Sequence, residues 1–226
     1  MWHNDAATTW RIGPASAPLR YLKVARPPGA VLGGALDLAG EARRLRWIGD
    51  RLPVPEVLAV GPVPDGAGQW MLTAALPGTH AIAPAHRERP EQTVATLGTA
   101  LRRFHDTLPV AECPWTWSPA EQAVDHPDHR VRELAATAPA VAPRDRVVCC
   151  GDACAPNVLL DAEGHLVGYV DLGDLGVGDR WADLAVALLS LGWNYGHGWD
   201  RTYLEAYGID PDPERISFHQ TLHQLT

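Results

Sequence analysis

The feature that most constrains this chain is a short polar stretch between two apolar segments. Cys150-Gly151-Asp152-Ala153-Cys154-Ala155-Pro156-Asn157 is followed, some way on, by Asp171-Leu172-Gly173. An acid, an amide five positions later and a second acid before x-Gly is typical of phosphoryl-transfer sites. The first acid can accept a hydroxyl proton, and the other two side chains offer the oxygen ligands that Mg²⁺ prefers. The pattern therefore predicts Asp152 as a catalytic base, and Asn157 and Asp171 as metal ligands.

The segments that flank this stretch are predicted to be strands. Arg146–Cys149 is apolar and leads into the stretch, and Val158–Leu160 and Leu166–Val170 form a hairpin around a Gly-containing turn. The hairpin carries Asn157 at one end and Asp171 at the other. We therefore expect it to bring their oxygens to one site.

A lysine and a glutamate upstream have a spacing that suits the same chemistry. Lys23 lies within a predicted strand, Leu19–Val24, and Glu41 follows it by 18 residues in a predicted helix, Ala39–Ile48. Such a pair can hold the lysine against the α- and β-phosphates of a nucleotide. Two alternatives remain, namely a lysine that snorkels from a sheet edge and a glutamate favoured by the helix dipole. Glu41 falls on the inward side of the helix, close to an apolar stripe made of Leu38, Leu45, Ile48 and Leu52.

The N-terminal third continues as a sheet and ends at a predicted hinge. Glu56–Val60 and Gln69–Thr73 read as strands separated by a Gly- and Pro-rich turn. Ala74–Gly78 then breaks the sheet. Kinases bind adenine through backbone groups at such a hinge, so by similarity to them Ala74 and Leu76 are the expected nucleotide contacts.

The remainder of the chain is predicted to be mostly helical. His105 lies in the clearest helix and is expected to be a surface residue and no catalyst. Asp183, at the start of a later helix, is either a buried acid that braces the polar stretch or an exposed first-turn acid. The predicted helices are Pro90–Leu108, one or two within 119–137 that are interrupted near His126-Pro127, a helix from Asp179 to about Trp193, Asp200–Tyr207 and Pro213–Leu225.

Composition narrows the class of partner. A net charge of −8 argues against nucleic-acid binding and suits a cationic small molecule. There is no uninterrupted apolar run of about 18 residues and no signal-peptide pattern, so neither a membrane span nor secretion is expected. The four cysteines lack the spacing of a disulfide framework or a zinc site. We expect a cytoplasmic protein, a monomer or homodimer, whose partner is a small molecule.

The chain resembles the aminoglycoside 3'-phosphotransferase family, which has a protein-kinase-like fold. The resemblance implies an α+β, two-lobed fold with a small β-rich N-lobe, truncated at its start, over residues 1–77, which binds nucleotide. A larger, mostly helical C-lobe over 78–226 would carry the catalytic loop, the metal site and the substrate site. The matching segments, which cover most of the chain in family order, are Tyr21-Leu22-Lys23-Val24, 41–47, 151–157, 168–173 and 175–185.

By this resemblance the chain would be an ATP- or GTP-dependent kinase that requires Mg²⁺. It would phosphorylate a hydroxyl of an aminoglycoside or related antibiotic and so give resistance or self-protection. Asp152 would be the base, Asn157 and Asp171 the Mg²⁺ ligands, Lys23 the phosphate contact and Glu41 its partner.

Several positions depart from the family pattern. Cys150 replaces a bracing histidine, and Asp174 stands where the family usually has arginine. Lys23 comes so early that it leaves room for one strand before its own, together with part of a phosphate-covering loop. The segment between Pro114 and Val147, which holds much of the aminoglycoside site in the family, is shorter.

The C-terminus is the largest departure. The family ends in Leu-Asp-Glu followed by two apolar residues, and its acids grip the ammonium groups of the drug, whereas this chain ends in Leu222-His223-Gln224-Leu225-Thr226. Losing two charge-assisted contacts favours a different or less cationic acceptor. The alternatives are a kinase of a peptide or nucleoside antibiotic, and a nucleotide-binding pseudokinase module. The expected substrate contacts are Asp152, Asp174, His223, Gln224 and Thr226.

Overall fold

The computed structural model describes residues 2–3, 7–14, 18–25, 36–64, 66 and 68–225. The chain forms two compact units. The first consists of Met1–Pro77 together with Gly168–Gly173, the segment that carries Asp171. The second consists of Gly78–Val167 and Asp174–Thr226.

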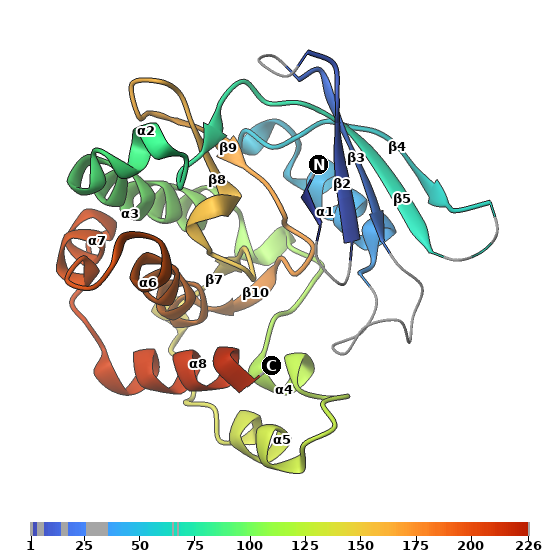
Figure 1. Ribbon diagram of the computed structural model, residues 1–226. Coiled ribbons are helices and arrows are strands. Elements are labelled where there is room, and N and C mark those ends of the chain that lie inside the picture. Colours follow the sequence, from blue (N-terminus) through green and yellow to red (C-terminus); the bar gives the residue numbers. More distant parts are fainter. Residues whose placement is uncertain are drawn as a thin grey trace. The chain divides into compact units, whose positions relative to one another are not determined.

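The first unit is built on an antiparallel sheet with the strand order β1-β2-β3-β5-β4 (Figure 1). Helix α1 (Leu38–Ile48) packs against β4 and β5 and is followed by a 3-10 turn, η1 (Gly49–Arg51). Asp37 caps the helix by accepting a hydrogen bond of 2.9 Å from the N–H of Gly40. The strands are β1 (Trp2–His3), β2 (Ala7–Ile12), β3 (Arg20–Ala25), β4 (Val57–Pro62) and β5 (Gln69–Ala74).

The first strand corrects one expectation from the sequence. The short start was predicted to leave room for one strand before the lysine strand, but there are two, because β1 pairs antiparallel with β2. Two residues carry too little periodicity to be recognised as a strand, and their pairing depends on a neighbouring strand. The strands and the helix predicted in this unit are otherwise confirmed, and the predicted stripe of Leu38, Leu45, Ile48 and Leu52 is buried.

The second unit contains two small sheets. One has the order β6-β8-β9, from β6 (Thr79–His80), β8 (Val158–Leu160) and β9 (Leu166–Tyr169), which confirms the predicted hairpin. The other pairs β7 (Arg146–Cys149) antiparallel with β10 (Gly176–Asp179). The sequence did not predict β10, since its Gly-Val-Gly-Asp composition is poor for a strand.

The glycines of β10 have a packing reason. A Cβ on Gly176 would lie 2.4 Å from the carbonyl oxygen of Thr116, and one on Gly178 would lie 2.8 Å from that of Trp117. Thr116 and Trp117 belong to the connector between η2 (Val110–Glu112) and α4 (Pro119–Gln122). This connector runs along β10, where the N–H of Trp117 donates a hydrogen bond of 2.9 Å to the carbonyl of Val177. The connector therefore requires a strand without side chains at these two positions.

Helices make up most of the second unit. Helix α3 packs on α7 and α6 packs on α8 (Figure 1). Every helix in the described ranges is too short or too polar to span a bilayer. The helices are α2 (Pro84–Arg87), α3 (Pro90–Thr107), α4 (Pro119–Gln122), α5 (His129–Ala136), α6 (Arg180–Tyr195), α7 (Asp200–Tyr207) and α8 (Pro213–Leu225), with 3-10 turns η2 (Val110–Glu112), η3 (Pro143–Asp145) and η4 (Ala155–Asn157).

Candidate active site

The predicted lysine–glutamate pair is present in the first unit. The Nζ of Lys23 lies 3.0 Å from an Oε of Glu41. Lys23 stands opposite the buried Met71 of β5, so its side chain lies on the covered face of the sheet. The helix turns Glu41 inward beside its apolar stripe, and only 5% of this residue is exposed. The sequence prediction that the two side chains pair is therefore confirmed.

Lys23 also binds Asp171. Its Nζ lies 2.6 Å from Oδ1 of Asp171, whose side chain is 43% exposed. Burial disfavours the charged form of the lysine, but the negative charges of Glu41 and Asp171 outweigh it and raise the pKa of Lys23. The ammonium therefore stays protonated throughout the physiological pH range.

Asp171 has an unusual backbone conformation. Its φ is +60°, the one positive value among the described residues other than glycine. Such a conformation is costly and persists only where the surroundings hold it. The chain just before Asp171 packs closely on another segment, because Tyr169 donates a hydrogen bond of 3.0 Å to the carbonyl of Pro53, and a Cβ on Gly168 would lie 2.6 Å from the same oxygen.

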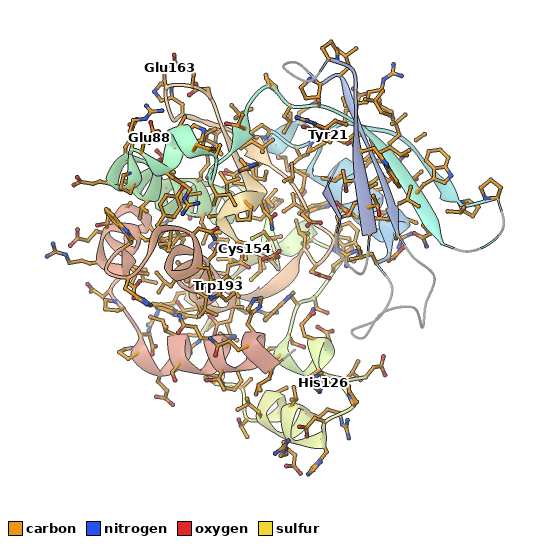
Figure 2. All side chains as sticks on the ribbon, viewed as in Figure 1. Tyr21, Glu88, His126, Cys154, Glu163 and Trp193 are labelled. Atoms are coloured by element: carbon orange, nitrogen blue, oxygen red, sulfur yellow. The ribbon has the colours of Figure 1, made fainter. Side chains whose placement is uncertain are left out.

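In the second unit, Asp152 and Asn157 contact each other. The Asn157 amide donates to Oδ2 of Asp152 at 2.9 Å and to the Asp152 carbonyl at 3.1 Å. The other carboxylate oxygen of Asp152, Oδ1, is buried and has no hydrogen-bond partner in the described part of the chain. A carboxylate oxygen in this state costs stability unless a ligand completes it. Cys154, which Figure 2 labels, lies between the two residues in the same loop.

Asp183 braces this loop from α6. Its carboxylate accepts hydrogen bonds from the N–H of Cys150 at 2.8 Å, the N–H of Gly151 at 3.1 Å and the thiol of Cys150 at 3.3 Å. Only 1% of Asp183 is exposed, so the buried interpretation is confirmed. The loop turns at Gly151, where φ is +89° and a Cβ would lie 2.6 Å from the Cβ of Asp174. Only glycine fits there.

His105 completes the brace. Its Nε2 lies 2.9 Å from Oδ2 of Asp183, and its Nδ1 lies 2.8 Å from the hydroxyl of Tyr207. The prediction that His105 is a surface residue is wrong, since 4% of it is exposed. The signal was in the sequence, because Leu101, His105 and Leu108 share the spacing of the apolar stripe of the predicted helix Pro90–Leu108.

The cysteines are all thiols rather than disulfides. Burial, reinforced by the charge of Asp183, raises the pKa of Cys150 well above its ordinary value. Burial acts in the same direction on the pKa of Cys149. The thiols of Cys149 and Cys150 are therefore protonated, and that of Cys150 donates a hydrogen bond to Asp183.

Asp152 lies in the wall of a cavity of about 250 Å³ in the second unit. Asp174 and His223, both predicted as substrate contacts, also line it. Gln224 is exposed and is not part of the lining, and Thr226 lies outside the described residues. Sequence reasoning missed Trp117 and His219, although His219 precedes His223 by one helical turn. The described lining is completed by Gln122, Gly151, Ala182, Val186 and Leu222.

The expected hinge follows β5. The N–H of Ala74 donates to the carbonyl of Glu56 at 2.9 Å, and that of Ala75 donates to the carbonyl of Leu19 at 3.0 Å. These two donors are therefore used within the sheet, and Leu76 supplies the next N–H along the chain.

The two predicted metal ligands carry oxygen donors. Within the described ranges, no group of three or more His, Cys, Asp or Glu side chains is gathered to hold a metal ion. Asn157 and Asp171 instead offer an amide and a carboxylate oxygen, the hard ligands that suit Mg²⁺. The amide N–H₂ of Asn157 is turned to Asp152, which makes its oxygen the group available to a cation.

The first unit is β-rich and holds the Lys23–Glu41 pair, and the second is mostly helical and holds the loop with Asp152 and Asn157. This combination is that of an α+β phosphotransferase with a protein-kinase-like fold. A family model described as "Phosphotransferase enzyme family" matches residues 6–219, and the chain belongs to this family. The resemblance drawn from the sequence is thereby confirmed.

Individual relatives agree with this assignment. The chain is 34% identical to an aminoglycoside 3'-phosphotransferase of Streptomyces fradiae, over 94% of this chain and 88% of the relative. It is also 34% identical to a streptomycin 3''-kinase of Streptomyces griseus, over 85% and 81% of the two chains. A crystal structure of a type VIII aminoglycoside-3'-phosphotransferase superposes with a TM-score of 0.74 at 29% identity, over 98% of this chain and 94% of that chain.

Proposed function

We propose that this chain transfers the γ-phosphoryl group of ATP to a hydroxyl of an aminoglycoside antibiotic. The observation that carries the proposal is the position of Asp152, which lies in the wall of a cavity and has a carboxylate oxygen, Oδ1, without a hydrogen-bond partner in the described part of the chain. A carboxylate oxygen placed in this way can accept the proton of a bound hydroxyl. The acceptor class follows from the relatives, which are named as kinases of aminoglycosides and of streptomycin.

In the proposed reaction the acceptor hydroxyl gives its proton to Asp152 as its oxygen bonds to the γ-phosphorus. The bond from that phosphorus to the β–γ bridging oxygen breaks, and ADP leaves with the electron pair. Most of the catalysis is positioning and electrostatic stabilisation. Asn157 contributes by donating to Oδ2, which fixes the Asp152 carboxylate and leaves Oδ1 to accept the proton.

On the nucleotide side, Lys23 would contact the α- and β-phosphates, with Glu41 holding its ammonium in place. The raised pKa of Lys23 supports this role, because the group remains a cation at any working pH. Adenine would meet backbone groups at Ala74 and Leu76. The Ala74 N–H is already used, so the donor to the base would be the N–H of Leu76.

Asn157 and Asp171 would hold Mg²⁺, which when bound neutralises charge on the phosphates. One oxygen of Asp171 binds Lys23, and the partly exposed carboxylate keeps its second oxygen for the ion. A nucleotide with Mg²⁺ would also relieve the crowding of two acids around one lysine.

All four thiols are reduced, which suits a reaction in the cytoplasm.

The test is a coupled assay of ADP release with a panel of acceptors. The panel contains kanamycin A, streptomycin, a nucleoside antibiotic and a peptide antibiotic, each with ATP or GTP and with Mg²⁺ or EDTA. We expect turnover of at least one aminoglycoside, and Asp152→Asn should lower kcat roughly 10²- to 10⁴-fold. Asp210→Asn, a change at an exposed aspartate, is the matched control and should leave kcat unaltered.

The other outcomes separate the alternatives. Turnover of only the nucleoside or peptide antibiotic would replace the aminoglycoside as acceptor. Nucleotide binding by calorimetry without turnover of any acceptor would favour the pseudokinase module. Full activity in Asp152→Asn would remove the proposed base.

A further inference from the structure

The acceptor cavity is small for the molecules that the proposed function assigns to it. Ligand pockets for drug-sized molecules are roughly 300–1,000 Å³. The cavity beside Asp152 is about 250 Å³, which suits one six-membered ring. An aminoglycoside has several linked rings, so any ring beyond the one being phosphorylated must bind outside the cavity.

A residue in the wall of the cavity contacts an exposed tryptophan. His223 of α8 lines the cavity, and its ring stacks on Trp193 of α6 with centroids 6.1 Å apart and an interplanar angle of 29°. Trp193 (Figure 2) is 58% exposed, the largest exposed fraction of any aromatic residue in the described ranges. Large exposed aromatic surface next to a cavity is typical of a binding site.

The chain around Trp193 is held in place. Asn194 donates a hydrogen bond of 2.8 Å to the carbonyl of Ser190, and the hydroxyl of Tyr195 donates one of 2.5 Å to the carbonyl of Ala81. The indole N–H of Trp199 in turn donates to the carbonyl of Tyr195 at 3.2 Å. Trp193 is therefore an exposed ring on an anchored segment, which presents its face at little entropic cost on binding.

The cavity lining and the Trp193–His223 pair differ in charge. Of the described residues that line the cavity, Asp152 and Asp174 are the acids. His223 and Trp193 bring no carboxylate. A cationic ring outside the cavity would thus be held by stacking and by cation–π attraction, for which tryptophan is the best side chain.

We propose that Trp193 and His223 form a second acceptor subsite, which binds an amino-sugar or aminocyclitol ring linked to the ring that is phosphorylated. This inference rests on the proposed function. The linked ring lays its C–H face or an ammonium group over the indole, and the reacting ring enters the cavity beside Asp152. Ring stacking here takes the place of ion pairing in holding the distal part of the acceptor.

The test compares a multi-ring acceptor with its own reacting ring. Kanamycin A is paired with 6-amino-6-deoxyglucose, and streptomycin with N-methyl-L-glucosamine, according to which drug the wild type phosphorylates. Trp193→Ala should raise KM for the multi-ring drug about 5- to 30-fold, and Trp193→Phe should raise it less. The KM for ATP, kcat and the kcat/KM of the single-ring acceptor should stay within about twofold of wild type. Trp10→Ala, at an exposed tryptophan of the first unit, is the matched control and should change none of these.

Each remaining outcome has a distinct meaning. An unchanged KM for the multi-ring drug in Trp193→Ala would overturn the subsite, as would an equal loss with the single ring. A fall in kcat with both acceptors would make Trp193 a support of the loop instead. If wild type phosphorylates no aminoglycoside, the proposed function fails first and the subsite fails with it.

Discussion

Two charged clusters on this chain are built on opposite principles. Around Lys23, one ammonium lies between two carboxylates, and one of these, on Asp171, is 43% exposed. Around Asp183, one carboxylate that is 1% exposed accepts hydrogen bonds from the loop backbone, the Cys150 thiol and His105. The first cluster has excess negative charge and an open side, whereas the second is closed.

The difference separates binding from support. Lys23 and Asp171 can exchange their mutual contact for phosphate and metal, because water and ligands reach the carboxylate. Asp183 has no comparable freedom, since each buried donor that it releases would lose its partner. The two clusters should therefore respond differently to mutation, the first mainly in activity and the second mainly in stability.

The largest effect is expected from removal of the closed cluster's acid. Asp183→Ala would leave the N–H groups of Cys150 and Gly151, and Nε2 of His105, without an acceptor in the interior. We expect the free energy of unfolding to fall by about 3–5 kcal/mol. Urea denaturation followed by tryptophan fluorescence measures this change.

The control is an acid that also starts a helix but faces solvent. Asp200 in the first turn of α7 is exposed, and Asp200→Ala should cost only about 0.3–1 kcal/mol, the usual dipole contribution. Equal losses for Asp183→Ala and Asp200→Ala would mean that the hydrogen bonds to the loop contribute little.

A smaller effect, of a different kind, is expected at the open cluster. Lys23→Met should lower kcat/KM for ATP roughly 10²-fold, as loss of a fixed electrostatic contact does. It should also destabilise the fold, because Glu41 would be left as a buried acid without its cation. Adding Glu41→Gln should restore the stability and leave the activity low. Steady-state kinetics and urea denaturation of the two single variants and the double variant test this separation.

Lys23 is also the single lysine of the chain, all other basic residues being arginine or histidine. An ammonium is a compact point charge, while a guanidinium is a planar fork, so Lys23→Arg should not restore activity. Wild-type kcat/KM in Lys23→Met would refute the assignment of this group to the phosphates. If Glu41→Gln left the double variant no more stable than Lys23→Met, the burial of Glu41 would not be the cause of the loss.

Elements with long apolar periodicity were predicted correctly, whereas short strands that depend on tertiary pairing were not. The Lys23–Glu41 pair and the loop acids followed from residue type and spacing, and the long helices followed from apolar stripes. Strands β1 and β6, of two residues each, and the glycine-rich β10 depend on partners distant in sequence.

The errors at the site have two causes. His105 was assigned to the surface although it shares the spacing of the apolar stripe on its helix. Its ring in fact fills the space between Asp183 and Tyr207, which are contributed by two other helices. Trp117 and His219 likewise meet in the cavity wall only once the connector and α8 are packed.

The smallest effect is expected at Cys150, the position that departs from the family histidine. Cys150→Ser keeps a side-chain donor for Asp183, so the free energy of unfolding should change by only about 1 kcal/mol. Because burial raises the pKa of the Cys150 thiol, the reactive thiolate should be absent in the folded protein at pH 8. Iodoacetamide should then modify Cys113 and Cys154, which are partly exposed, and spare Cys149 and Cys150 until urea is added.

The pH dependence of stability follows with a definite sign. The folded chain keeps the thiols of Cys149 and Cys150 protonated, whereas the unfolded chain ionises them near their ordinary value of about 8.5. The unfolded state then binds fewer protons, so stability should fall as the pH rises above that value. The double variant Cys149→Ala/Cys150→Ser should lose this alkaline slope. Labelling of Cys150 in the folded wild type at the rate of Cys154 would instead place it in an open site, like Asp171 rather than Asp183.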